Sequence, residues 1–337
     1  MSRLAAGLLF VLLGGAPGDP VSPRFAPRDG EAARVDFERV LRLELVGAER
    51  RFTLNGEVVD TEEEPRPRLV LTETETLRYH DEFRVRGGAL VGLRRHFEEI
   101  GNLYEARLDP AQADAQENET AGASELEGRT VLFTREEASG AFAVELLGEA
   151  PEDPELLEGL EARADLSDFL PAEPVEVGQA WAPSPRAFVR MTNLSGDLRV
   201  LPEGVPAEEH DTDFARQFDE NLDGELSARL VEVVEEGDVH VAVISLGVEL
   251  RTRVEEAGEL EGEETSGVER REHDFDFVLE GELRWDLGRG LARSLRLSGP
   301  LRLETASFSA YSAGPRELEI AEVQRFEGRL EFEASVE

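Results

Sequence analysis

The sequence of 337 residues contains no cysteine and no lysine. Without cysteine there can be no disulfides, no thiolate metal sites and no thiolate nucleophiles, and no lipid can be attached through a cysteine thiol. Without lysine, all 36 basic residues are arginine, which excludes the Ser-x-x-Lys catalytic motif. Aromatic residues are also scarce, at 7%. We therefore expect the fold to be held together by its hydrophobic core.

Basic residues are few relative to acidic ones: 36 arginines against 74 acidic residues give a formal net charge of −38. A chain this negative repels nucleic acid and anionic lipid, so neither is expected as a partner. It attracts divalent cations and basic peptides in a salt-dependent way. One functional alternative is therefore an acidic surface or interaction protein that engages cations or cationic partners.

Long apolar runs are absent after the first eighteen residues, and the run within them is short. Met1-Ser2-Arg3 is a positive start, residues 4–13 are apolar, and residues 14–18 are small or turn-forming. This layout is typical of a secretory signal peptide, and ten apolar residues are too few for a stable membrane span. We expect an exported chain, periplasmic or extracellular, without a lipid anchor or a membrane span.

Alternation of apolar and polar residues with a period of two, which indicates β-strands, dominates the rest of the chain. Residues 19–34 are rich in proline and charge and predict an extended leader. Hairpins are predicted with turns at Gly87-Gly88 and at 136–140. The polar stretch 109–124 predicts a mobile loop.

The clearest alternation lies in the C-terminal half. One face of the strand predicted over 275–287 consists of Phe275, Phe277, Leu279, Gly281, Leu283, Trp285 and Leu287. A turn at 288–290 leads into a return strand, and 326–336 alternates in the same way. Long strands with one apolar face favour a large antiparallel sheet that curves over a core.

One segment breaks this pattern. Over 152–170, Leu156, Leu160 and Ala164 fall on one stripe between Pro154 and Pro171, which predicts an amphipathic helix. The expected fold is mainly β (α+β): a large curved antiparallel sheet or half-barrel with this one covering helix.

The predicted sheet has two possible organisations. An N-terminal β lobe over 35–174, including the helix, is followed by a C-terminal β lobe over 175–337. The two either meet as separate lobes near Gln179-Ala180-Trp181 or form one continuous sheet.

Motifs that carry chemistry are few. Asp219, Asn221 and Asp223 match the first half of a calcium loop, but Leu230 stands where the closing acid belongs, so a turn feeding a hairpin is expected. The five histidines show no zinc-binding spacing; they are His80, His96, His210, His240 and His273. No Gly-x-Ser-x-Gly motif or glycine-rich phosphate loop occurs. We therefore expect no cofactor and no catalytic residues, with an undetected hydrolase as an alternative.

The link Leu-Pro-Ala-Glu-Pro-Val-Glu-Val-Gly-Gln-Ala-Trp at 170–181, together with the strand pair at 281–299, resembles uncharacterised exported bacterial proteins. These combine a Leu-Pro-x-x-Pro-Val-x-Val-Gly-x-x-Trp link with a similar later hairpin. The resemblance implies a curved half-barrel similar to periplasmic lipoprotein carriers, in which helices cover a hydrophobic cavity. The anchor cysteine that many such proteins carry is missing here, and the family implies no catalytic residues.

These observations predict an exported, non-catalytic protein that binds an apolar ligand between the inner face of the sheet and the helix. The ligand-cavity candidates are Phe277, Leu279, Leu283 and Trp285. No feature of the sequence specifies the oligomeric state.

The signal peptide can be tested directly. We expect cleavage after Gly18, because Ala16 and Gly18 are the small residues and cleavage after Ala16 would place Pro17 next to the scissile bond. Mass spectrometry of the protein exported by a bacterial host should show a chain that begins at Asp19. A product retaining Met1 would show that the segment is not a cleaved signal.

Overall fold

The computed structural model describes residues 19–59, 68–109, 116–151, 153, 155–163, 165–202, 204–206, 213–262, 265–313 and 316–337. Within these residues the strands are β1 (Ala32–Leu54), β2 (Glu57–Val59), β3 (Arg68–Arg86), β4 (Ala89–Asp109), β5 (Gln116–Ala123), β6 (Thr130–Arg135), β7 (Phe142–Leu147), β8 (Ala180–Trp181), β9 (Leu201–Pro202), β10 (Asp223–Glu236), β11 (Val239–Gly262), β12 (Thr265–Asp286), β13 (Leu291–Ala313) and β14 (Arg316–Val336). The helices are η1 (Ser167–Phe169), α1 (Arg186–Thr192) and α2 (Asp213–Glu220).

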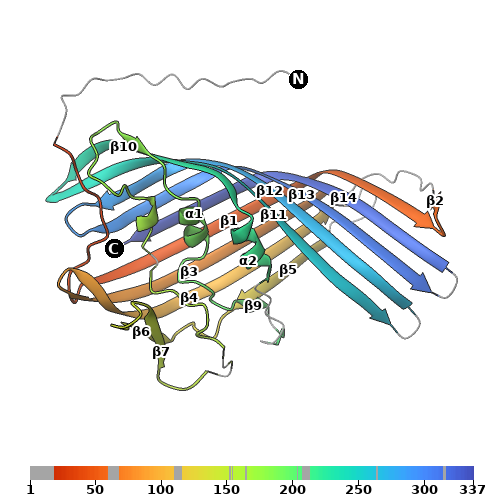
Figure 1. The fold of residues 1–337 in the computed structure, drawn as a ribbon, viewed down its shortest axis with the longest axis horizontal. Helices are drawn as coiled ribbons and strands as arrows, with labels where there is room; N and C mark the ends of the chain where they lie inside the picture. The colour runs from red at the N-terminus through yellow and green to blue at the C-terminus, as the bar shows by residue number, and fades with distance from the viewer. Residues whose placement is uncertain are drawn as a thin grey trace.

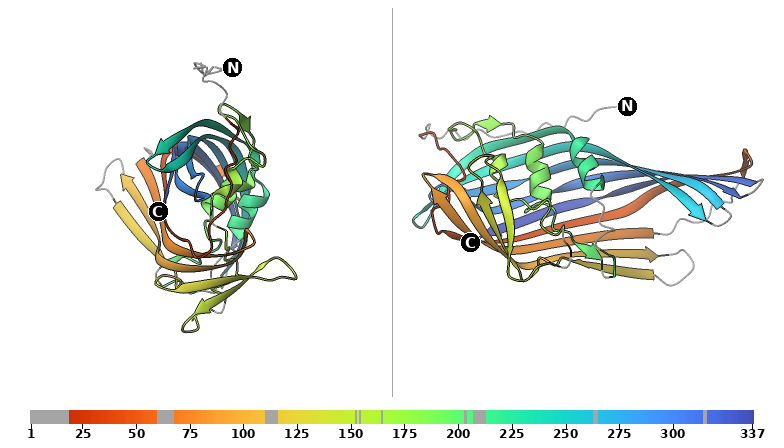
Figure 2. Two further views of the ribbon diagram at one scale, coloured as in Figure 1. Left: turned by 90° about the vertical axis from the view of Figure 1, so that its left-hand side faces the viewer. Right: turned by 60° about the horizontal axis from the view of Figure 1, so that its bottom comes forward.

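The strands form one antiparallel sheet in the order β7-β6-β4-β3-β1-β14-β13-β12-β11-β10-β8, with β2, β5 and β9 off this path. Pairing of β1 with β14 joins the two halves of the chain, from Val35 opposite Val336 to Leu54 opposite Leu318. Both halves therefore belong to one continuous sheet. Figures 1 and 2 show that it curls into an open trough. The predicted fold class, a large curved antiparallel sheet, is confirmed.

The concave face of the trough holds the core, as period-two alternation requires. Phe37, Leu77, Phe97, Leu283 and Phe332 all point inward and are buried. The convex face carries rows of arginine and glutamate. Such exposed ion pairs contribute little stability each, so the inner face holds the sheet together.

Three glycines allow the sheet to curve sharply. Gly281, Gly299 and Gly328 lie on the concave side of the neighbouring strands β12, β13 and β14. A β-carbon at Gly281 would lie 1.9 Å from the carbonyl oxygen of Arg296, and one at Gly328 would lie 1.9 Å from that of Arg42. Only glycine permits backbones to approach this closely, which is typical of tight bends in curved sheets.

The concave side is covered by α1, α2 and the irregular segment between β7 and β8 (Figure 2). In the described part of the chain, no helix is long and apolar enough to cross a membrane. The predicted helix over 152–170 is wrong: its described residues form turns and the single 3-10 turn η1. The helices that cover the sheet are α1 and α2, which the sequence reasoning missed.

A buried arginine accounts for the irregular backbone of this segment. Arg95 on β4 is fully buried and makes a bidentate pair with Asp81 on β3, at 2.8 and 2.7 Å. Its guanidinium also donates to Ser195 Oγ at 2.6 Å and to the backbone oxygens of Glu161 and Ala162 at 3.1 and 3.3 Å. Carbonyl groups that a helix would use internally are thus bonded to the sheet.

Glycine also opposes a helix here. Gly159 has φ +79°, and the next residue, Leu160, forms an isolated bridge with Gly196. The leucine stripe was nevertheless informative, because Leu156 and Leu160 are buried against the sheet. Apolar spacing identified the buried side chains but not the backbone conformation.

Of the other predicted elements, the two hairpin turns are confirmed and the predicted loop is not. The hairpin turn at Gly87-Gly88 is confirmed, with φ +61° and +80°, and so is the turn between β6 and β7. The predicted loop over 109–124 is wrong where β5 pairs with β4, and 110–115 lie outside the described residues. The predicted signal peptide also lies outside them.

Residues 19–31 lie across one end of the trough. Val21 bridges to Val175, and the amide of Ala26 donates to the oxygen of Gly290 at 3.0 Å. β1 begins at Ala32, within the predicted leader. This part of the chain is therefore tied to the sheet.

The buried pair gives a stability prediction. We expect Arg95→Met to lower the free energy of unfolding by about 3–5 kcal/mol, because it leaves the buried Asp81 carboxylate uncompensated. Urea denaturation measures the loss. The double variant Arg95→Met/Asp81→Leu should recover much of it, since no unpaired charge remains.

A matched control is Arg94→Met, at an exposed position that lies 3.9 Å from Glu82. It should change stability by no more than about 0.5 kcal/mol. Equal effects at residues 94 and 95 would show that the buried pair does not hold the segment in place.

Candidate functional site

A cavity of about 480 Å³ lies between the concave face of the sheet and the two α-helices. Its volume is within the range of about 300–1,000 Å³ common for small-molecule sites. The residues that line it are Arg39, Leu41, Leu43, Glu73, Phe188, Thr192, Asn193, Phe214, Ala215, Phe218, Asp219, His273, Phe275, Phe277, Leu301, Leu303, Leu330 and Phe332. Most of this wall is aliphatic or aromatic.

Helix α1 forms one end of the cavity. Pro185 precedes its first residue, a position where proline is tolerated, and Phe188 and Met191 are buried. The ring of Phe188 lies between those of Phe277 on β12 and Phe332 on β14, with centroids 5.6 and 5.9 Å away. Helix α1 therefore lies at the boundary between the packed core and the cavity.

Helix α2 contributes a second aromatic wall. Phe214 and Phe218, four residues apart, face the sheet, with ring centroids 6.3 and 5.8 Å from that of Phe275. Phe218 also lies 5.8 Å from Phe277. None of the helix residues is fully buried, so its position depends on these rings and on polar contacts with β11.

Those contacts lie where β11 extends past its pairing with β10. Asn221 Nδ2 donates to the oxygen of Arg253 at 2.9 Å, and Gln217 Oε1 accepts from the amide of Glu255 at 2.9 Å. Thr252 Oγ1 donates to the oxygen of Phe218 at 2.8 Å. Side chains thus replace a neighbouring strand and hold α2 at the sheet edge.

A charged cluster from β1, β3 and β4 adjoins the apolar wall. Arg39 lies 3.0 Å from Glu73 Oε1 through Nη2 and 3.0 Å from Glu75 Oε2 through Nε. Asn102 Nδ2 donates to Glu73 Oε1 at 3.0 Å. Burial raises the pKa of Glu75 against the opposing effect of Arg39. One guanidinium thus serves two carboxylates.

A second polar region lies near β12 and α2. His273 Nδ1 is 3.1 Å from Thr305 Oγ1, and its Nε2 is 3.0 Å from Glu256 Oε2. Asp219 lines the same cavity from α2. Partial burial of its carboxyl group and, to a lesser extent, the negative charge of Glu161 raise the pKa of Asp219 to about 6.

The structure separates the four cavity candidates. Phe277 lines the cavity, whereas Leu279, Leu283 and Trp285 are fully buried in the packed core. The indole Nε1 of Trp285 has no hydrogen-bond partner among the described residues. The role of Phe277 as a ligand contact stays a prediction.

The candidate calcium residues do not converge. Asp219 faces the cavity from α2, Asn221 bonds to β11, and Asp223 begins β10. Across the described ranges, no group of three or more metal-ligating side chains is placed to hold an ion. His80, His96 and His240 lie on exposed strand positions or bond to neighbouring polar groups, and His210 lies outside the described residues.

The sequence reasoning missed most of the aromatic wall. Phe214 and Phe218 on α2 and Phe188 on α1 belong to helices that it did not predict. The spacing of Phe214 and Phe218 by four residues was the available signal. His273 could not be singled out from the sequence, because its partners come from β11 and β13.

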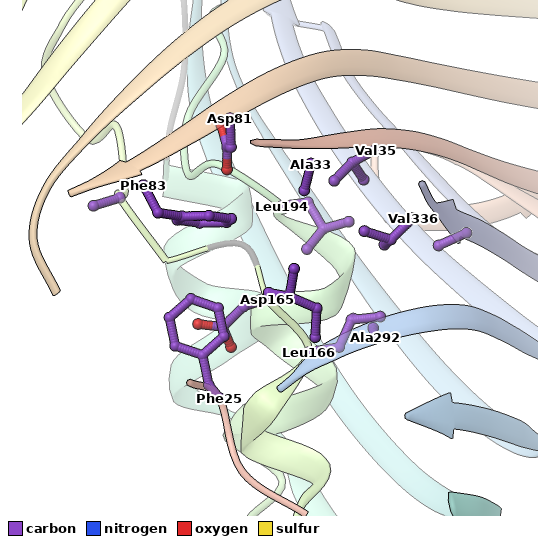
Figure 3. A pocket seen from close by; sticks show the side chains of 13 residues that line it. Phe25, Ala33, Val35, Asp81, Phe83, Asp165, Leu166, Leu194, Ala292 and Val336 are labelled. Carbon is purple, nitrogen blue, oxygen red and sulfur yellow. The ribbon is translucent and has the colours of Figure 1, made fainter. Parts of the chain in front are cut away.

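A second, much smaller cavity of about 30 Å³ lies at the end of the trough near Phe25 (Figure 3). Phe83, Leu166 and Val336 face it together with the carboxylates of Asp81 and Asp165 (Figure 3). A space of this size can hold a water molecule but no organic ligand. Of these two cavities, the larger has room for an organic ligand and a largely apolar wall, and we take it as the candidate functional site.

No protein-family model matches the sequence, and no curated protein matches it either. The assignment of the site therefore rests on the geometry of the described residues.

The raised pKa of Asp219 gives a pH prediction. An aspartate whose folded pKa is about 6, above its ordinary value of 3.8, binds its proton more tightly in the folded state. Ionisation of Asp219 therefore costs stability as the pH rises from about 4 through about 6. Asp219→Asn should be more stable than the wild type above this window and equal to it below, as measured by urea unfolding across pH.

The same substitution at the exposed Asp223 provides the control for removing one negative charge. If both variants change the pH dependence equally, the position of Asp219 at the cavity is not the cause.

Proposed function

We propose that this protein is an exported, non-catalytic binding protein that holds an apolar ligand between the concave face of the sheet and helices α1 and α2. The observation that carries the proposal is the cavity of about 480 Å³ with a largely apolar wall. The cavity opens to solvent on one side, so its leucine and phenylalanine side chains remain partly exposed to water. An apolar ligand that displaces this water would bury that apolar surface, which is favourable.

The architecture supports the same conclusion. A curved, open sheet with helices on its concave side corresponds to the half-barrel implied by the resemblance to periplasmic lipoprotein carriers. Export rests on the N-terminal segment 1–18, which has the layout of a signal peptide. Helix α2 has no fully buried residue, and among the described residues it meets the sheet through ring contacts and hydrogen bonds with β11. The wall it forms can therefore move without unfolding the sheet.

One observation favours a second candidate, a hydrolase. The row Glu256, His273 and Thr305 resembles an acid, base and hydroxyl nucleophile, and His273 faces the cavity. However, β13 pairs with β12 and β14 on either side of Thr305. The backbone amides of β13 around Thr305 are therefore hydrogen-bonded within the sheet and cannot stabilise an oxyanion. Binding is the better supported function.

The binding proposal can be tested by filling the cavity. Ala215 lines it from the exposed helix α2, so Ala215→Trp should occupy the space without disturbing the core. We expect this variant to bind the neutral fluorophore N-phenyl-1-naphthylamine about tenfold more weakly than the wild type, on the order of 1.4 kcal/mol. Fluorescence titration measures the difference.

The matched control is Ala257→Trp, at an exposed position on β11 that does not line the cavity. It should bind the fluorophore as the wild type does. Native mass spectrometry of the purified wild type should also show co-purified lipid. Absence of both fluorophore binding and bound lipid would refute the proposed function.

A further inference from the structure

The polar side chains at the cavity carry an excess of negative charge. The charged residues that line it in the described part of the chain are Arg39, Glu73 and Asp219, and Glu75 stands directly behind Arg39. Three carboxylates therefore accompany one guanidinium. The histidine on the wall, His273, already contacts Thr305 and Glu256.

The single guanidinium is already engaged. Arg39 contacts Glu73 and Glu75 at 3.0 Å each, so its charge is more than balanced by its neighbours. It is therefore poorly available to an incoming anion. A ligand carboxylate or phosphate placed here would meet like charges in a partly desolvated space, which is unfavourable.

One acceptor on the cavity wall remains open to a donor. Asp219 lines the cavity from α2 and forms no ion pair among the described residues, and only partial burial and another acid, Glu161, perturb its pKa. Behind the wall, Asn102 donates its Nδ2 to Glu73, so it offers the ligand no cationic group either. An ammonium head could therefore donate to the carboxylate of Asp219 without displacing an existing partner.

We infer that the cavity selects amphiphiles whose head is a cationic hydrogen-bond donor, such as a primary ammonium group, and discriminates against those with a carboxylate head. The apolar tail would lie among Phe188, Phe275, Phe277 and Leu303, and the head would reach Glu73 or Asp219. This inference rests on the proposed function, because it specifies the ligand of the same cavity.

The magnitude follows from the chemistry of the head. A hydrogen bond between charged partners contributes about 1.5–3 kcal/mol, which corresponds to a tenfold or larger preference over a head without such a bond. A carboxylate head gains no such bond here and is repelled, so it should bind more weakly than the neutral alcohol of equal chain length.

The test compares dodecylammonium, 1-dodecanol and dodecanoate, each below its micelle concentration, as competitors of N-phenyl-1-naphthylamine. Near pH 7 the amine and the acid are both ionised. Displacement of the fluorophore reports only ligands that occupy the cavity. Weak attraction of the ammonium group to the acidic outer surface is therefore not detected. Salt at about 0.15 M screens that attraction. We expect dodecylammonium to displace the fluorophore at concentrations at least about tenfold lower than dodecanoate.

Two variants localise the selectivity. Asp219→Asn and Glu73→Gln should each reduce the ratio of the dodecylammonium affinity constant to the dodecanoate affinity constant toward one, by severalfold. Asp219 is on the exposed helix α2, so this variant remains informative if Glu73→Gln disturbs the cluster around Arg39. Glu249→Gln, at an exposed position on the convex side of β11, removes the same charge and should leave the ratio unchanged.

The outcomes are distinguishable. If all three amphiphiles displace the fluorophore equally, or if dodecanoate displaces it best, the head-group inference is wrong while apolar binding stands. If the fluorophore and all three amphiphiles fail to bind, the proposed function itself is wrong. A preference that Glu249→Gln reduces as much as Asp219→Asn would place the discrimination on the general surface charge and overturn the inference.

Discussion

The pairing of Arg95 with Asp81 is the interaction on which the interior of this protein depends. Both side chains lie on the concave face of the sheet, where an uncompensated charge would be very costly. The guanidinium satisfies its remaining donors with Ser195 and with backbone oxygens at Glu161 and Ala162, and it stacks 4.3 Å from the ring centroid of Tyr79. Burial of the arginine therefore requires the covering segment, and the covering segment is positioned by the arginine. A sheet of this curvature could not otherwise hold an irregular backbone against its inner face without leaving many polar groups unsatisfied.

This arrangement divides the trough into two parts with different physical properties. Around Arg95 and α1 the concave face is packed, with Trp285, Phe97 and Phe133 fully buried. Beyond Phe188, the described residues that cover the concave face are those of the short helix α2, which meets the sheet through Phe214 and Phe218. The cavity lies where the close packing ends. The strands continue past it, so its walls are set by a rigid sheet on one side and a lightly held helix on the other.

The glycines of the central strands make this geometry possible. Gly281 and Gly328 remove side chains where neighbouring backbones would otherwise collide, and the sheet can curl around its contents. The resulting concave surface brings Arg39 on β1, Glu73 on β3 and Asp219 on α2 to a single cavity. Charge within that cavity is unbalanced even though the convex face pairs many of its glutamates with arginines. Discrimination between ligand heads would thus be a property of a few inward-facing residues, not of the overall charge of −38.

The sequence by itself determined the fold class and most of the long strands with their inward-facing side chains, although it gave no sign of β5. Alternation with a period of two is a local property of a half-buried strand, so the 275–287 face and the Gly87-Gly88 turn could be predicted without tertiary information. Only the tertiary structure decided the conformation of 152–170, the positions of α1 and α2, and which inner residues line a cavity. Those outcomes depend on contacts between distant residues, such as Arg95 with Glu161 and Phe188 with Phe332. Phe277 and Leu283 share one strand face and one hydrophobic character, yet one meets the cavity and the other meets packed core. The curvature of the sheet and the covering helices decide which side chains lie opposite each of these two residues. The local sequence pattern carries no information about those partners.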